Sequence, residues 1–369
     1  MTEYRTCEEK EHRSAIELSK SVFKENMEEQ FPLLLGKTNL ERMFVCVKDK
    51  EVVSLVNYYP AHVKLNESHI TVGSIGSVCT HQNFRGQKMA STLLILAENQ
   101  MLKEQIRIAI ISGEGGIYHK MGATVVGDVD AFILNKSSVE AFSHYSLLEY
   151  QEKYLKELLS IYNQETIRFV RSESEFSLLI LGQTYPDTFA TYPNLLIFEN
   201  ETLVAYIIFE MKNNLKSLLV KEYGGSRQAI VETIPLILKK YNKNKLTILA
   251  TPEDEIHEML KKHKVHKTDQ HASFKIIDFL GLISDLKPYF LSKFDEEFLN
   301  QIKIKIEETK YVFTFENEKF IINDIHELNK LIFGPNKNII KQVSSFTLKL
   351  FLKEVFPIPF VWTHNLNYQ

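Results

Sequence analysis

The chain has 369 residues, of which 44% are hydrophobic and 25% are charged, with only 14 glycines and 10 prolines. This length exceeds that of an ordinary single domain, so we expect two or three folded domains, each with its own core. The formal net charge of -3 provides no overall basic field, which argues against a nucleic-acid partner.

The N-terminal residues and the cysteines indicate the cellular compartment in which the protein is expected. Residues 1–10 are polar and acidic, unlike a signal peptide, and no apolar run approaches the length of a membrane span. Cys7, Cys46 and Cys79 are widely spaced and match neither a zinc pattern nor a disulfide framework. We therefore expect a cytoplasmic protein that has no membrane partner and no metal.

The first block, residues 1–136, has the pattern of an α+β domain. One or two helices are expected within 14–35, and a hairpin within 43–63 that turns at 48–50. Residues 68–78 alternate apolar and small polar side chains, as a half-buried strand does. Residues 89–102 then place apolar side chains at helical spacing, so a strand leads through a short turn into a helix.

That turn has the features of a phosphate-binding site. Arg85 and Gly86 lie just before the predicted helix, where the first backbone N–H groups have no intrahelical acceptor. The free donors and the helix dipole together attract an anion such as a pyrophosphate.

The same residues resemble the acetyl-CoA motif of the GNAT N-acetyltransferases, whose form is Gln or Arg, two residues, Gly, one residue, and Gly or Ala. Arg85 and Ala90 match this motif, whereas Lys88 replaces the middle glycine. A side chain there could obstruct the phosphate, or its ammonium could pair with it. The resemblance implies acetyl-CoA as co-substrate, held by Val78, Cys79, Thr80, Arg85, Gly86, Gln87, Lys88, Met89, Ala90, Ser91 and Ser112.

A second segment resembles the same family. Residues 108–112 form a short apolar run, and residues 113–123 resemble the later GNAT turn and helix that carry a tyrosine. The resemblance implies that Tyr118 is the general acid that protonates the leaving thiolate, a role open to a well-placed phenol. The alternative is a tyrosine that only packs against the sheet.

The reaction implied is direct transfer of the acetyl group to an amine, with backbone N–H groups near Val78 polarising the thioester carbonyl. A covalent route through Cys79, with His81 as its base, is the other possibility. A cysteine within a strand is more often a packing residue, so direct transfer is favoured.

The second block, residues 137–271, repeats the order of the first. A hairpin over 194–198 and 202–212 precedes a strand over 215–222, a loop at 223–227 and a helix over 229–240. The loop lacks the Arg-Gly pattern, so we interpret this block as a degenerate second GNAT-like fold. Its histidines match no ligand motif and are expected in a solvated helix and its end: His257, His263, His266 and His271.

The third block, residues 272–369, combines a strand over 274–277, an amphipathic stretch over 280–294 and a hairpin over 311–315 and 319–322. Residues 286–289, 333–334 and 365–369 resemble the sterol-carrier-like domain that follows two GNAT folds in the enhanced intracellular survival family of aminoglycoside acetyltransferases. The resemblance thus implies tandem GNAT folds with a sterol-carrier-like C-terminal domain.

In that family the terminal carboxylate enters the first active site, which here implies that the α-carboxylate of Gln369 is a candidate base. The alternative is a frayed terminus. Glu25, Glu28 and Glu29 lie where GNAT acceptors enter, although a solvated helix face is the favoured explanation of such charges. The expected partner is a small-molecule or peptide amine, and homo-oligomers stay open.

A different class of function also stays open. With Lys88 at the motif glycine, the chain could instead be a non-catalytic protein that binds acetyl-CoA, or an apolar ligand in its third block. Release of CoA thiol with any amine would separate the enzyme from the binding protein.

Overall fold

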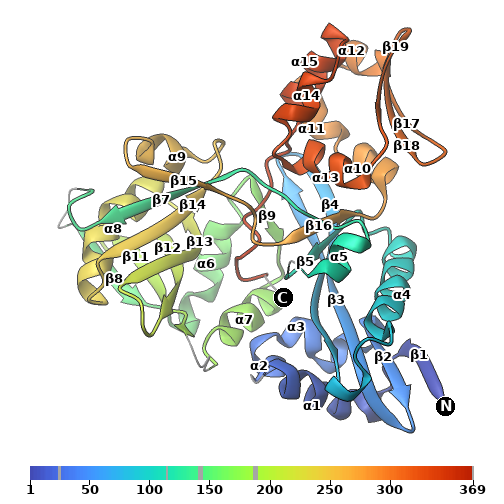
Figure 1. Ribbon diagram of the computed structural model, residues 1–369. Coiled ribbons are helices and arrows are strands. Elements are labelled where there is room, and N and C mark those ends of the chain that lie inside the picture. The colour runs from blue at the N-terminus through green and yellow to red at the C-terminus, as the bar shows by residue number, and fades with distance from the viewer. Residues whose placement is uncertain (24–25, 114, 140–143, 186–189, 368–369) are drawn as a thin grey trace.

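The computed structural model describes residues 1–23, 26–113, 115–139, 144–185 and 190–367. They form three lobes, each built around its own β-sheet (Figure 1). The first lobe contains the first sheet with α1–α5, the second lobe contains the second sheet with α6–α9, and the third lobe contains a three-stranded sheet with α10–α15.

The first sheet has a single parallel pair, β4 with β5, among its described pairings. Its order is β1 (Thr2–Thr6), β2 (Met43–Lys48), β3 (Glu51–Leu65), β4 (Ser68–Thr80), β5 (Ile108–Ile111), β16 (Ser273–Ile276) and β6 (Thr124–Val125), and β9 (Ile167–Val170) also pairs with β3. The hairpin expected within 43–63 is confirmed, and so is the strand over 68–78.

Helices cover both faces of this sheet. On one face lie α1 (His12–Phe23), α2 (Met27–Gln30) and α3 (Pro32–Leu35), and on the other lies α4 (Met89–Lys103). Leu93 and Met101 of α4 pack against Tyr58 and Ile75, whereas Leu34 packs on the opposite face. The apolar periodicity of residues 89–102 therefore marks the buried stripe of α4.

The second sheet repeats the arrangement, again with one parallel pair, β13 with β14, among its described pairings. Its order is β15 (Lys264–Thr268), β7 (Val129–Asn135), β14 (Lys245–Ala250), β13 (Ser217–Gly225), β12 (Thr202–Lys212), β11 (Asn194–Glu199) and β8 (Tyr145–Glu149), and β10 (Ala190–Thr191) also pairs with β12. Its helices are α6 (Leu155–Tyr162), α7 (Glu173–Gly182), α8 (Arg227–Lys240) and α9 (Glu255–Leu260).

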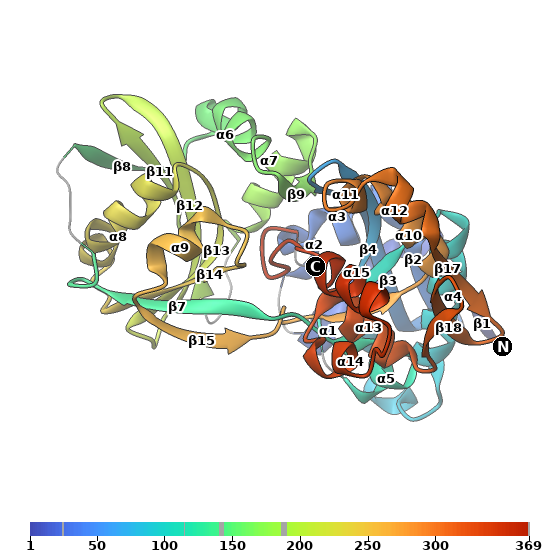
Figure 2. The ribbon, with the colours of Figure 1, turned by 90° about the horizontal axis from the view of Figure 1, so that it is seen from above.

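The two sheets exchange strands, which the division at 136/137 and 271/272 does not anticipate. β7 follows the first lobe in sequence but pairs with β14 in the second sheet. β16 follows the second lobe but pairs with β5 in the first sheet. The exchanged strands occupy equivalent positions, each beside the shorter member of the parallel pair, and their connections cross between the lobes (Figure 2).

The third lobe shares a core with the first sheet. Val72 and Ile110 belong to the same buried cluster as Leu331 and Phe351. Its elements are α10 (Phe279–Asp285), α11 (Lys287–Leu291), α12 (Glu296–Gln301), β17 (Ile302–Glu307), β18 (Lys310–Phe315), β19 (Glu318–Ile322), α13 (Ile325–Phe333), α14 (Lys337–Lys341) and α15 (Phe346–Val355). The sterol-carrier-like resemblance of this lobe stays a prediction.

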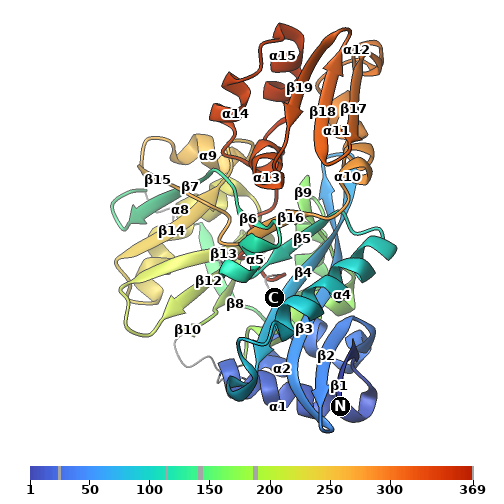
Figure 3. The same ribbon diagram turned by 45° about the vertical axis from the view of Figure 1, so that its right-hand side comes forward.

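After α15 the chain turns back toward the other two lobes. The C-terminal tail, residues 356–367, ends at the junction between the first and second sheets (Figures 1 and 3). None of the described helices combines the length and the apolar character needed to cross a membrane.

The strand exchange predicts that the first block cannot fold by itself. A fragment of residues 1–136 lacks β16, so β5 becomes an open edge, and the apolar face under the third lobe is exposed. We expect no cooperative thermal transition by circular dichroism. In contrast, residues 1–127 joined to residues 270–369 should unfold cooperatively, because this chain keeps β16 and the third lobe. A short glycine linker can join the two parts, since the Gln270 N–H lies 2.9 Å from the Val126 carbonyl. Cooperative unfolding of the 1–136 fragment would contradict the role given to β16.

Candidate active site

The site begins where β4 outlasts its parallel neighbour. β4 pairs with β5 from Val72 to Ile75, and the Ser112 N–H adds a last hydrogen bond to the Ile75 carbonyl at 3.3 Å. Beyond Ile75, β4 continues to Thr80 while the chain after β5 turns away toward α5 (Gly116–Lys120). The backbone of β4 after Ile75 therefore has no partner on the β5 side within the described pairings.

A β-bulge lies in this stretch of β4. Asn57 of β3 pairs with Gly76, whereas Leu55 pairs with Cys79, so β4 carries an extra residue. Ser77 takes up the irregularity with a φ of 51°. A bulge leaves backbone groups outside the ladder and re-aims the strand, so polar main-chain groups near Val78 are available for a ligand.

The turn into α4 completes the other side. Arg85 donates from Nε to the Thr80 carbonyl at 3.2 Å, which ties the turn back to β4. Gly86 has a φ of 80°, and a Cβ there would meet no atom within 4 Å, so its need is conformational rather than steric. Because α4 starts at Met89, the first N–H groups of this helix have no intrahelical acceptor.

Lys88 adopts the left-handed conformation that glycine would favour, with φ 60° and ψ 14°. A non-glycine residue pays about 1–2 kcal/mol for this conformation. The Lys88 side chain is exposed, and its ammonium forms no ion pair with any residue that the structure describes. The turn thus keeps a backbone shape suited to glycine while it presents a cation.

Tyr118 lies on α5, directly after the end of β5. Its ring packs in the same cluster as Val78 and Met89, close to Gly113 and Gly115. Burial, with a smaller effect from Cys79, raises the pKa of Tyr118 to about 12. The phenol therefore stays protonated at neutral pH, which is the state that a general acid requires.

Cys79 does not have the environment of a nucleophile. Its side chain is buried among apolar residues of α1 and β2, and burial raises the pKa of the Cys79 thiol to about 12. His81 instead accepts a hydrogen bond from the Asn83 N–H through Nδ1, at 3.3 Å, and caps a short 3-10 helix, Gln82–Phe84. A neutral thiol is a poor nucleophile, so the arrangement favours the packing role.

The candidate residues thus separate into those that meet and those that do not. Val78, Ser112 and Tyr118 lie at the carboxyl ends of β4 and β5, and residues 85–91 form the adjoining turn and helix start. Glu28 is half-exposed, 3.9 Å from His12, and Glu29 is exposed. Glu25 and Gln369 lie outside the described residues.

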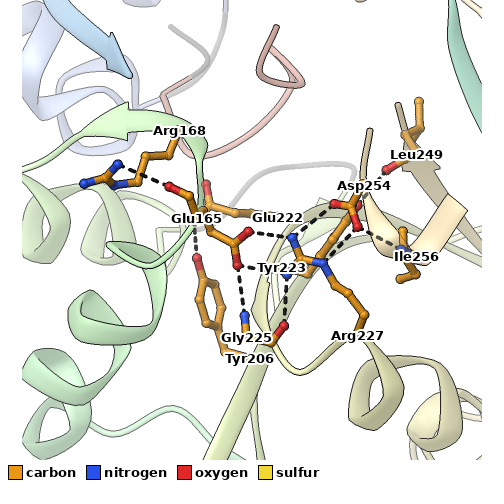
Figure 4. A network of polar contacts seen from close by, with 10 residues as sticks. All are labelled: Glu165, Arg168, Tyr206, Glu222, Tyr223, Gly225, Arg227, Leu249, Asp254 and Ile256. Carbon is orange, nitrogen blue, oxygen red and sulfur yellow. Dashed lines mark hydrogen bonds and ion pairs between the residues drawn. The ribbon is translucent and has the colours of Figure 1, made fainter. Parts of the chain in front are cut away.

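The second lobe has the same strand geometry with different charges. β13 and β14 pair only over 217–219 and 245–247, and Gly225, with φ 89°, leads into α8. Arg227 at the start of α8 binds Glu165 at 2.5 Å and Asp254 at 2.9 Å (Figure 4). Burial lowers the pKa of Arg227, but the two carboxylates raise it more, so this pKa stays above its usual value.

A cavity of about 710 Å³, called here the second cleft, lies beside Arg227 at the ends of β13 and β14. Its walls include Glu165, Arg227 and Asp254, together with Phe360 and Trp362 of the C-terminal tail. No local sequence pattern predicts this ion network, because Glu165 and Asp254 lie 62 and 27 residues from Arg227. The two carboxylates already neutralise the cation, so this helix start is unsuited to a pyrophosphate.

The histidine-rich segment, which the sequence predicts to be a solvated helix and its end, instead divides between a helix and a strand. α9 ends at Leu260, and residues 264–268 form strand β15, which pairs with β7. His257 binds Asp130 through Nε2 at 2.7 Å. The described residues contain no group of three His, Cys, Asp or Glu side chains that could hold a metal ion.

Comparison with known proteins agrees with this geometry. Residues 3–126 match the model of the acetyltransferase (GNAT) domain family. No curated protein sequence matches the chain. The likeness to solved structures, in contrast, extends over nearly the whole chain.

Three of these structures show the extent of the likeness. A GCN5-related N-acetyltransferase from Anabaena variabilis is 13% identical with a TM-score of 0.67, over 98% of this chain and 99% of that one. A GCN5-related N-acetyltransferase from Kribbella flavida is 10% identical with a TM-score of 0.64, over 98% and 100%. Eis1 from Mycobacterium abscessus is 10% identical with a TM-score of 0.64, over 96% of each chain.

At these identities the structures share the fold alone, and the family assignment comes from the matched segment, residues 3–126. That segment contains the bulge of β4, the turn into α4 and Tyr118. Residues 3–126 are therefore an acetyltransferase domain of the GNAT family, within a chain that has the α+β fold of multidomain GNAT proteins.

Proposed function

We propose that the protein transfers the acetyl group of acetyl-CoA directly to an amine of a small molecule or peptide, in the first lobe. The observation that carries this proposal is the placement of a half-buried phenol, Tyr118, beside the end of β4 that has no described partner on the β5 side, within the GNAT domain. The second lobe has no equivalent free cation at its helix start, because Arg227 is neutralised.

The turn between β4 and α4 would hold the pyrophosphate of acetyl-CoA. The backbone N–H groups at the start of α4 and the exposed ammonium of Lys88 supply donors and positive charge. Arg85 is tied to Thr80, so it would add charge from a fixed position.

The reacting atoms would lie between the bulge of β4 and Tyr118. Main-chain N–H groups near Val78 would stabilise the developing oxyanion. The amine nitrogen bonds to the acetyl carbon, the C–S bond breaks, and the thiolate takes the phenolic proton of Tyr118. The amine proton leaves to a base, for which we propose the α-carboxylate of Gln369. The tail reaches the junction of the first and second lobes by Leu366, which packs with Leu33, and Asn367, which bonds to Arg171.

A non-catalytic acetyl-CoA-binding protein was the other candidate, on the strength of Lys88. The left-handed conformation of Lys88, which a glycine at this position would also adopt, supports the enzyme over this alternative. The third lobe buries its apolar residues against the first sheet, which favours an architectural role over carriage of an apolar ligand.

Replacing Tyr118 with Phe tests the acid. We expect Y118F to lower kcat by about 100-fold or more, since general-acid catalysis contributes 10²–10⁴-fold. The dissociation constant of acetyl-CoA, measured by calorimetry, should stay within about threefold, because the ring still packs near Val78. Thiol release across a panel of amines measures kcat. Unchanged turnover in Y118F would exclude Tyr118 as the acid.

Two substitutions at Lys88 separate its conformation from its charge. Both K88G and K88A remove the ammonium, so both should bind acetyl-CoA several-fold more weakly at low salt. Only K88G relieves the left-handed conformation, so K88G should exceed K88A in free energy of unfolding by about 1 kcal/mol. Urea denaturation measures this difference. Equal stabilities would show that Lys88 is not strained, and unchanged acetyl-CoA affinity would show that its ammonium does not meet a phosphate.

A further inference from the structure

The C-terminal tail is bound along its length rather than lying loosely on the surface. The Ile358 N–H bonds to the Ile332 carbonyl at 2.8 Å. Thr363 bonds to Gln270 twice, through its N–H at 3.2 Å and through its hydroxyl to the Gln270 carbonyl. Leu366 is 1% exposed, so the tail is as well buried as a core element where it reaches the second lobe.

At the end of the tail lies a buried ion pair that no step of the proposed reaction uses. The Arg171 and Glu222 side chains, 1% and 6% exposed, form a bidentate contact at 2.8 and 2.7 Å. The Arg171 guanidinium also lies over the Tyr162 ring, 4.1 Å from its centroid. Burial lowers the pKa of Arg171, but the Glu222 carboxylate helps to keep this pKa above its usual value.

Both members of this pair also bind the tail. The remaining edge of Arg171 donates from Nε to Oδ1 of Asn367 at 2.7 Å. Glu222 accepts from the Leu366 N–H at 3.5 Å, beside its bond from the Tyr206 hydroxyl at 2.9 Å. Because a pair this deeply buried contributes little net stability over apolar packing, its contacts with the tail are its distinctive consequence.

The same place touches the first lobe. Leu366 packs in one cluster with Leu33 of α3, and Tyr59 of β3 packs against that cluster. Tyr59 pairs with Ser74 on β4, one residue before Ile75, where β4 separates from β5. The tail therefore ends beside the strand pair that carries the candidate active site.

We propose that Arg171 and Glu222 form a clamp for the chain's own C-terminus, with Arg171 and Asn367 as positioning residues. The degenerate second lobe acts through this clamp, by holding the last residues against the first lobe. The clamp itself follows from the contacts, whereas its effect on turnover rests on the proposed acetyltransferase function.

The second lobe offers a matched control. Arg227 is also a largely buried arginine bound to two carboxylates, but its described partners are Glu165, Asp254 and Gly225, and none belongs to the tail. Loss of Arg227 should therefore disturb the second lobe without releasing the tail.

The clamp is tested by carboxypeptidase digestion of the full chain under native conditions, followed by intact-mass analysis. We expect slow removal of residues 365–367 from the wild type and removal about tenfold faster or more from N367A, which loses a hydrogen bond to a buried cation. N367D keeps the acceptor oxygen and should restore slow removal. Because R171M alone would leave Glu222 buried and unpaired, the double variant R171M/E222L replaces the pair with apolar side chains and should also lose the tail faster.

The control is R227M, which should release residues 365–367 at the rate of the wild type. The clamp is overturned if N367A and R171M/E222L are trimmed as slowly as the wild type. It is equally overturned if R227M is trimmed as fast as they are, because general loosening of the second lobe would then explain the release.

The link to catalysis has a separate readout. With acetyl-CoA saturating, N367A should raise the KM for the amine or lower kcat at least fivefold, with the dissociation constant of acetyl-CoA within twofold and recovery in N367D. Faster trimming with unchanged kinetics would overturn the positioning role. No turnover by the wild type with any amine would refute the proposed function, while the digestion would still decide the clamp.

Discussion

The candidate active site depends on the two-sided pairing of β5. The four residues of β5, Ile108–Ile111, pair in parallel with β4 on one side and antiparallel with β16 on the other. Since β5 is short and paired on both sides, β4 continues past Ile75 with β3 as its one partner strand among the described pairings, and the chain after β5 turns toward α5, which carries Tyr118. The strand that completes this arrangement follows the second lobe in sequence, so segments on both sides of that lobe are needed to build one site.

Local structure was predictable from the sequence because its causes are local. Alternation over 68–78 and helical spacing over 89–102 identified β4 and α4, and the turns at 48–50 and 199–201 identified two hairpins. Strand exchange was not predictable, since the pattern of a strand tells which face is buried but not which neighbour it pairs with. β7 and β16 were therefore placed with the wrong sheets.

The candidate site was predictable in its residues and less so in its conformations. The sequence showed that Lys88 stands at a glycine position, but only the backbone shows that it adopts the glycine-like conformation. Ser77 likewise adopts a positive φ at the bulge, which cannot be predicted from the presence of a serine. The roles given to Tyr118 and Gln369 stay proposals that rest on the family resemblance and on the geometry around α5 and the tail.

The second lobe shows how a fold can keep its shape while its charges change. Both lobes have a parallel pair and a glycine turn into a helix, yet in the second lobe Glu165 and Asp254 pair with the cation that an anion would need. Nearby, Arg171 binds Asn367 and Glu222 binds Leu366 of the tail (Figure 4 shows Glu222 beside Tyr206). The buried arginines of this lobe, Arg171 and Arg227, thus form ion pairs with carboxylates of the same chain.

The central claim is that acetyl-CoA binds in the first lobe, between the bulge of β4 and the start of α4. A crystal structure of the full chain with CoA tests it most directly. The account predicts the pyrophosphate on the N–H groups that begin α4 and the sulfur within hydrogen-bond distance of the Tyr118 hydroxyl, with the second cleft free of CoA. CoA bound at Arg227 in the second lobe, or a sulfur far from Tyr118, would contradict it.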